Sequence, residues 1–246
     1  INANGSVGTC TQQNGAITTP RTRIRSLAYS GFLYVTGGGD GGYYATVQYC
    51  PINANGSIGT CNATTSFTTA RSDHASFEYN GYVYVVGGNN SFQNDIQRLP
   101  VNTGTPSFGT VGATTQQTGT FTPARSGHSS VAYNGYLYFI AGTSSSAVQY
   151  ASINSDGSVG SLTATTALAS NRSYHASVVY NGYLYVIGGN GSGTGCSAGY
   201  CNDVQYAPIN SDGTVGSWTA TTSFTAARLG HTSVAYNGYI YVLGGT

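Results

Sequence analysis

The sequence predicts an all-β protein built from copies of one antiparallel unit. The segment 71–88 returns with small changes as 125–142, 172–189 and 228–245, and a weaker first copy covers 21–38. The arginines that open the copies lie 50, 54, 47 and 56 residues apart. A period of about fifty residues indicates a repeat architecture in which each copy is one supersecondary unit.

Each unit begins with a predicted β-hairpin. In the copy that opens at Arg71, polar and apolar residues alternate from His74 to Tyr79, as in a strand with one buried face. Asn80-Gly81 then supplies the two residues of a type I′ turn, and the run that follows is almost entirely apolar up to Gly87-Gly88. The opening Arg is expected to tie loop carbonyls to the neighbouring unit, because its planar side chain carries five donors.

A third and a fourth strand are expected after a variable loop. The third strand carries an aliphatic residue followed by Gln, at 47–49, 96–98, 148–150 and 204–206. A second turn, at 55–56, 156–157 or 212–213, leads into a Thr-rich fourth strand that ends before the next Arg. Each unit is therefore a four-stranded meander, and a ring of such sheets packed face to face would cover both faces of the apolar strands.

This repeat resembles the kelch family of β-propellers over essentially the whole chain. The resemblance rests on the double glycine after the second strand, the Tyr that precedes it and the Arg that opens each unit. The family's fourth-strand Trp survives only as Trp218, and one double glycine is Ala141-Gly142. The resemblance implies a five-bladed kelch-like β-propeller of four-stranded antiparallel blades.

We expect a single domain over residues 1–246, with its last blade completed by the N-terminal segment. The expected blades are approximately 21–70, 71–124, 125–171, 172–227, and 228–246 together with 1–20. The segment 1–8 matches 52–59, so it would end a third strand and lead into a fourth. One strand is then missing, and either the last blade has three strands or the natural chain continues further. A start without Met or a secretion signal indicates a processed or excised chain.

The five cysteines predict two disulfides. Cys196 and Cys201 lie in one Gly-rich loop, and Cys50 and Cys61 flank the Asn55-Gly56 turn symmetrically. A two-residue turn would make the second pair hydrogen-bonded neighbours. Cys10 is left over, and its expected partner would lie two residues before Ile1, which favours lost upstream residues over a reactive thiol. Disulfides predict an oxidising compartment, hence an extracellular or cell-surface location.

Charge and hydropathy argue against nucleic acid as a partner and against membrane insertion. The chain has 8 Arg and Lys residues, all of them Arg, 7 Asp and Glu residues, and a net charge of +1. Such a surface lacks the basic field that nucleic acid requires. No apolar run approaches the roughly 20 residues of a membrane-spanning helix, so we expect no membrane insertion.

Four histidines share one repeat position, three residues after the opening Arg: His74, His128, His175 and His231. A metal-binding ring is conceivable, but equivalent positions spread around a wide ring and the first copy has Ile24 there, so we expect structural packing and no metal. No catalytic constellation or cofactor motif is predicted. The alternative is a carbohydrate-active enzyme resembling galactose oxidase or the sialic-acid mutarotases, which are kelch relatives. The copper site of galactose oxidase uses two His, two Tyr and a Tyr–Cys crosslink, whereas every His here lies on the repeat.

Ligand binding is expected where the repeat is broken. In a propeller, the loops after the double glycines and before the first strands share one face. The predicted ligand-binding residues on it are Arg23, Arg25, Asp40, Tyr43, Tyr44 and Asp73, with Phe92, Tyr174 and Tyr200 on the same face. Tyr and Arg among Gly, Ser and Asn are typical of adaptable binding surfaces. The sequence thus favours a secreted or cell-surface binding or adhesion module for a glycan or protein ligand. The competing interpretation is that these residues are merely solvated loops.

Overall fold

The computed structural model describes residues 2, 4–9, 12, 17–117, 119–193 and 195–246. This part of the chain contains antiparallel strands and no helix. It therefore has no helix that is long and apolar enough to cross a membrane. The expectation of an all-β fold made of antiparallel sheets is confirmed.

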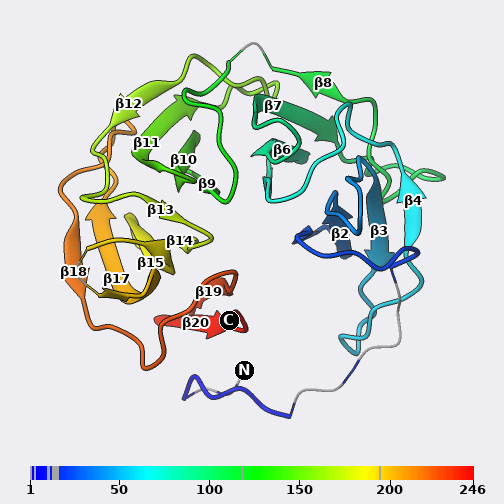
Figure 1. Ribbon diagram of the computed structural model, residues 1–246. Coiled ribbons are helices and arrows are strands. Elements are labelled where there is room, and N and C mark those ends of the chain that lie inside the picture. Colours follow the sequence, from blue (N-terminus) through cyan, green and yellow to red (C-terminus); the bar gives the residue numbers. More distant parts are fainter. Residues whose placement is uncertain (1, 3, 10–11, 13–16, 118, 194) are drawn as a thin grey trace.

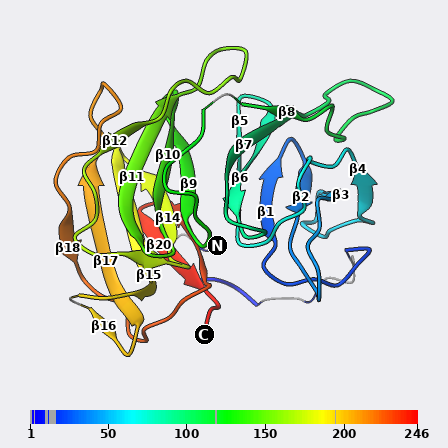
Figure 2. The same ribbon diagram turned by 45° about the horizontal axis from the view of Figure 1, so that its top comes forward.

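The sheets stand around a common centre, with the short fourth strands on the outside (Figures 1 and 2). The first sheet has the order β1 (Arg25–Tyr29), β2 (Phe32–Thr36), β3 (Val47–Pro51), β4 (Asn62–Thr64). The second has the order β5 (Ala75–Tyr79), β6 (Tyr82–Gly88), β7 (Gln93–Pro100), β8 (Thr115–Gln116).

The next two units are joined into one sheet. The third unit is β9 (Ser129–Tyr133), β10 (Tyr136–Gly142), β11 (Ser145–Ser152) and β12 (Thr163–Thr165). The fourth is β14 (Ala176–Tyr180), β15 (Tyr183–Gly191), β17 (Tyr200–Pro208) and β18 (Thr219–Thr221), with β16 (Cys196–Ser197) beside β17. Strand β13 (Arg172–Ser173) pairs with both β10 and β15 and so links the two units. A last sheet consists of β19 (Thr232–Tyr236) and β20 (Tyr239–Leu243).

The turn between the first two strands of each unit is the predicted type I′ turn. In the second unit φ is 48° at Asn80 and 81° at Gly81, and the other four units repeat these positive values. Both central residues of a type I′ turn need positive φ, which Asn and Gly adopt at low cost. The strands on either side are therefore paired without any offset, with Tyr79 opposite Tyr82.

The second turn differs from the expected two-residue hairpin. Ile52 bridges Ile58, which leaves a five-residue loop, whereas Tyr49 pairs with Asn62 in the register expected from a two-residue turn. The register therefore shifts by one residue between the turn and the strands. The Cα atoms of Cys50 and Cys61 lie 4.1 Å apart, a spacing typical of a non-hydrogen-bonded pair and not of the hydrogen-bonded pair expected. The Cys50–Cys61 and Cys196–Cys201 disulfides are both formed.

Apolar side chains fill the space between successive sheets. Between the second and third units, Tyr84 and Val86 of β6 pack with Phe121, Leu137 and Phe139, and all five are fully buried. The first strands also contact one another in sequence, β1 with β5, β5 with β9, β9 with β14 and β14 with β19. The core is thus a series of inter-sheet layers.

Three of the five opening arginines, Arg71, Arg125 and Arg172, are buried within this framework. Arg71 donates to the Gly87 carbonyl at 3.0 Å and to both carboxylate oxygens of Asp95 on β7, at 2.6 and 3.0 Å. Its own carbonyl oxygen accepts from the Gly38 amide of the preceding unit at 2.9 Å. The expected link between units is therefore made by the backbone of Arg71, whereas its side chain bonds mainly to its own unit.

The N-terminal segment meets the last sheet through a turn. A Cβ added at Gly5 would lie 2.8 Å from the Tyr239 ring, just as Cβ atoms added at Gly109, Gly157 and Gly213 would lie 2.6 Å from Phe32, Tyr82 and Tyr136. In each of those three cases the turn belongs to the unit that follows the aromatic residue. Among the described residues of the segment 1–20, none pairs with β20 as a strand. The proposed position of Cys10 lies outside the described residues.

Candidate functional site

Arg23, Asp73 and Tyr174 occupy the same position in three different repeat units, and the backbone there is left-handed. Two residues after each opening Arg the chain is left-handed, with φ of 55° at Arg23, 51° at Asp73, 62° at Gly127, 53° at Tyr174 and 68° at Gly230. Glycine adopts this conformation freely, but a residue with a Cβ does so at a cost of about 1–2 kcal/mol. The first, second and fourth units therefore hold strained side chains where the other two have glycine.

Backbone hydrogen bonds join these turns around the centre. The Gly127 amide donates to the Asp73 carbonyl at 3.0 Å, the Tyr174 amide to the Gly127 carbonyl at 2.7 Å, and the Gly230 amide to the Tyr174 carbonyl at 2.9 Å. These three bonds connect the second, third, fourth and fifth units in succession. The side chains of Arg23, Asp73 and Tyr174 lie at the edge of one cavity, which we call the rim.

Arg23, Arg25, Asp73 and Tyr174 line one cavity of about 520 Å³ at this rim, together with His175, Gly230 and His231. Arg23 Nη1 lies 3.5 Å from Asp73 Oδ2, with the Arg23 side chain 61% exposed and that of Asp73 4% exposed. Asp73 also accepts a hydrogen bond from Ser72 Oγ at 3.1 Å. The carboxylate is thus fixed, whereas the exposed guanidinium is free to adjust to a ligand.

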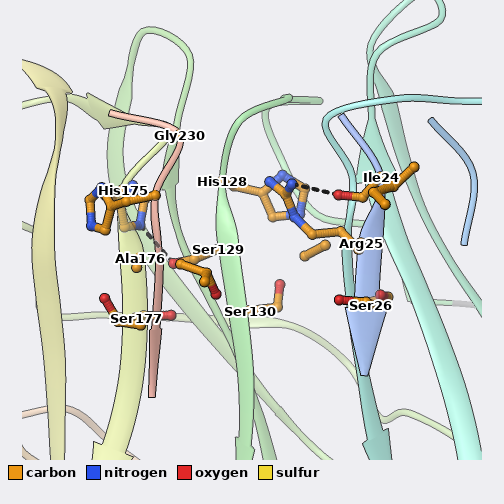
Figure 3. Close-up of a pocket in the computed structure, with 15 residues that line it drawn as sticks. Ile24, Arg25, Ser26, His128, Ser129, Ser130, His175, Ala176, Ser177 and Gly230 are labelled. Carbon is orange, nitrogen blue, oxygen red and sulfur yellow. Dashed lines mark hydrogen bonds between the residues drawn. The ribbon is translucent and has the colours of Figure 1, made fainter. Parts of the chain in front are cut away.

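Arg25 begins β1 and points into the centre, where its Nη1 donates to the Ile24 carbonyl at 3.1 Å (Figure 3). Burial lowers the pKa of Arg25, and the charge of Asp73 partly offsets this. Burial and the Asp73 carboxylate raise the pKa of Tyr174. The rim therefore offers two cations, one carboxylate and a neutral phenol.

A second hollow of about 370 Å³ adjoins the first, since Arg23 lines both. Arg23, Asp40, Tyr43 and Ser72 line it, and Tyr43 is 43% exposed. Tyr44 has a different role, because the Arg21 guanidinium lies 5.0 Å from its ring centroid and its amide donates to the Gly38 carbonyl. The structure thus brings five of the six predicted residues to two adjoining hollows and places Tyr44 in neither. Phe92 and Tyr200 line neither hollow.

A ring of serines lies below the rim. Two residues after each repeat His, or after Ile24 in the first unit, the chain has Ser26, Ser76, Ser130, Ser177 and Ser233, and all five line a central cavity of about 320 Å³. Within the described chain, the Oγ atoms of Ser130, Ser177 and Ser233 have no protein partner (Figure 3). The repeated His-x-Ser pattern was the signal in the sequence for this ring, but the pattern alone also fits ordinary strand alternation.

The histidines are buried between the sheets. His74 Nε2 lies 2.9 Å from Thr36 Oγ1 of the preceding unit, and His175 Nε2 lies 2.7 Å from Ser129 Oγ. Burial lowers the pKa of His175 to about 3 and holds the pKa of His74 and His128 well below the ordinary value. These imidazoles are therefore neutral at pH 7 and connect one sheet to the next.

One group of residues in the described part of the chain has the spacing of metal ligands. Cys196, Cys201 and Asp203 have their ligand-type atoms within 4.8 Å of one another. The two sulfurs are joined in a disulfide, so they are not thiolates, which are the forms of cysteine that bind metal ions. Asp203 is also paired with Arg172.

Comparison with known proteins supports the fold. No family model and no curated protein matches the chain. A solved structure of a protein named YjhT superposes with a TM-score of 0.69 over 93% of this chain and 73% of that chain, at 14% sequence identity. At this identity the likeness shows a shared fold, an all-β propeller-like arrangement, and nothing of the ligand.

Proposed function

We propose that this chain is a secreted or cell-surface binding module, a kelch-like propeller of five blades whose loop face recognises a glycan. The five copies of the repeat support at least five blades. The two disulfides support an oxidising environment and therefore an extracellular location.

The convergence of three strained side chains carries the proposal. Arg23, Asp73 and Tyr174 come from three different units and meet at one cavity, each in a left-handed backbone conformation that glycine occupies in the other two units. Folding alone would be served better by glycine at all five positions. Backbone strain of this kind clusters at functional sites, so the observed outliers support a ligand-binding role.

The chemistry of the rim suits a carbohydrate. The ring of Tyr174 offers a face for the C–H groups of a sugar, and Tyr43 offers another in the adjoining hollow. The guanidinium of Arg23 and the carboxylate of Asp73 offer a donor and an acceptor for hydroxyl groups. A cavity of about 520 Å³ falls within the range of small-molecule sites, roughly 300–1,000 Å³. A concave polar site of this size favours a glycan over a flat protein surface.

The experiment is a glycan array followed by calorimetric titration of the best ligand. We expect the double variant Arg23→Gly/Tyr174→Gly to lose binding at least tenfold, because it removes a donor and an aromatic face without straining the turn. The matched control is Asn80→Gly/Asn134→Gly, which changes two other left-handed positions in the first hairpin turns. By the antiparallel topology these turns lie at the opposite ends of the strands. Equal binding by the site variant and the control would contradict the proposal.

A further inference from the structure

The rim cavity and the second hollow meet at one side chain. Arg23 lines both, and no other residue in the described part of the chain does so. Its side chain is exposed and lies 3.5 Å from the Asp73 carboxylate. Arg23 therefore forms the boundary between the two hollows, and its guanidinium is open to a ligand from either side.

The two hollows offer a ligand the same kinds of groups. Tyr174 and Asp73 line the rim cavity, and Tyr43 and Asp40 line the second hollow. Each hollow thus has one phenol ring and one carboxylate beside the shared guanidinium. The contacts that suit one sugar unit in the rim cavity are therefore available again to a unit next to it.

The backbone that carries both rings is held in place. Gly39 forms β-bridges with Thr22 and with Tyr43, and Thr22 and Gly39 exchange two backbone hydrogen bonds of 2.9 Å. This ties the loop of Tyr43 to the residue before Arg23. The Tyr174 amide is held by the Gly127 carbonyl at 2.7 Å. Because the two backbones are already ordered, a ligand that reaches both rings spends little free energy on arranging them.

The groups between the hollows are polar. Ser72 lines the second hollow, and its Oγ donates to Asp73 Oδ2 at 3.1 Å, while Asp73 and Arg23 face the rim cavity. A chain that passes from one hollow to the other must cross these groups. Their hydrogen-bonding capacity suits the hydroxyl groups and the linking oxygen of a saccharide, and it would be left unsatisfied by an apolar chain.

The size of the hollows also fits more than one sugar unit. Both volumes, about 520 and 370 Å³, fall within the range of small-molecule sites, roughly 300–1,000 Å³. A single sugar in the rim cavity would leave the second hollow to water and the Tyr43 ring exposed. Covering that ring contributes binding energy only for a ligand that extends past Arg23.

We propose that the chain recognises an oligosaccharide of at least two sugar units that lies across Arg23, with one unit in the rim cavity and the next in the second hollow. This inference rests on the proposed glycan-binding function and names the class of glycan. The first unit stacks on Tyr174, the second on Tyr43, and Arg23 donates to hydroxyl groups of both. Once the first unit is bound, the second binds as an intramolecular event, so the disaccharide gains affinity over the monosaccharide.

The probes are the mono-, di- and trisaccharides of N-acetylglucosamine, glucose, galactose and mannose, all carried on the glycan array. Calorimetric titration then follows each series that binds. We expect the disaccharide to bind about tenfold more tightly than the monosaccharide, since one stacking contact and its hydrogen bonds are added. The trisaccharide should gain less, because the third unit extends beyond the two hollows.

Tyr43→Ala should remove most of the gain of the disaccharide, because the ring of the second hollow is lost. Tyr200→Ala is the matched control. Tyr200 is 41% exposed against 43% for Tyr43, and it lines neither hollow, so its removal should leave the gain intact. Arg23→Gly should weaken both the monosaccharide and the disaccharide, because Arg23 lines both hollows. Melting temperatures establish that each variant is folded.

The outcomes separate this inference from the function on which it rests. Equal affinity for monosaccharide and disaccharide would overturn the two-unit site and leave glycan binding standing. A Tyr43→Ala variant that keeps the full gain, or a Tyr200→Ala variant that loses as much of it as Tyr43→Ala, would also overturn the two-unit site. Absence of binding to every glycan on the array would instead be the failure of the proposed function, and the two-unit site would fall with it.

Discussion

At the scale of single residues, one backbone position distinguishes scaffold from site. The turn requires a left-handed backbone, which Gly127 and Gly230 adopt freely because they have no Cβ. Arg23, Asp73 and Tyr174 adopt the same conformation at a cost in stability. Stability and function are therefore expected to separate when these positions are changed.

Tyr174 offers a direct comparison of two substitutions. Tyr174→Ala keeps the left-handed strain and removes the ring, whereas Tyr174→Gly removes both. We expect the Gly variant to be more stable than the Ala variant by about 1 kcal/mol, measured by urea denaturation. An Ala variant as stable as the Gly variant would show that the turn carries no strain.

A buried histidine gives a second test at this scale. His74→Ala removes the hydrogen bond to Thr36 Oγ1 and leaves a cavity between the first and second units. We expect a loss of roughly 1–3 kcal/mol in the free energy of unfolding. The glycan affinity of the folded variant should stay within twofold of the original, since His74 lines neither hollow and its ring joins two sheets. A large loss of affinity with unchanged stability would instead make His74 a ligand contact.

At the scale of the elements, the disulfides secure the irregular ends of sheets. Cys50 and Cys61 join the end of β3 to the segment before β4, and Cys196 and Cys201 join β16 to β17. The first pair closes a longer stretch of chain, with a separation of 11 residues against 5. Chain-entropy arguments favour the longer loop as the stronger constraint on the unfolded state.

Removing the two disulfides separately should show this order. Cys50→Ala/Cys61→Ala is expected to lower the free energy of unfolding by roughly 3 kcal/mol, and Cys196→Ala/Cys201→Ala by roughly 2 kcal/mol. Denaturation curves of both variants beside the oxidised protein provide the measurement. Peptide mapping without reductant should first confirm both pairs in the purified protein. The reverse order of losses would mean that native-state packing, and not chain entropy, dominates.

At the scale of the whole molecule, stability should depend on pH through its buried imidazoles. The folded-state pKa of His175 is lowered by burial to about 3, and that of His74 and His128 lies well below the ordinary value. Above pH 6.5 these groups are neutral in both the folded and the unfolded chain. As the pH falls from 6.5 towards 3, these imidazoles bind protons in the unfolded chain but stay neutral in the folded chain.

Stability should therefore be greatest above pH 6.5 and should decrease below it. For each buried His, the free energy of unfolding should fall by up to about 1.4 kcal/mol for each pH unit below 6.5. Melting temperatures from pH 8 to pH 4 test the expectation, and His175→Asn should flatten the slope. A melting temperature that is constant from pH 7 to pH 5 would contradict it.

The sequence by itself determined the local features of this protein. The repeat, the type I′ turns, the third strands and the two disulfides depend on residues close together in the chain, such as Asn80-Gly81, whose preference for positive φ acts wherever the turn lies. Even here the second turn departed from expectation, because a single-residue shift at Ile52 and Ile58 cannot be read from a symmetric spacing.

Only the tertiary structure decided which residues of the loop face meet. Arg23 and Arg25 line one cavity with Asp73 and Tyr174, although Tyr174 is about a hundred and fifty residues away from them in the chain. Tyr44 packs against the Arg21 guanidinium, although its neighbour Tyr43 lines a hollow. The place of Gly5 against Tyr239 was likewise set by packing. The physical reason is that turn chemistry is encoded in a few adjacent residues, while convergence at a centre depends on how every sheet packs against the next.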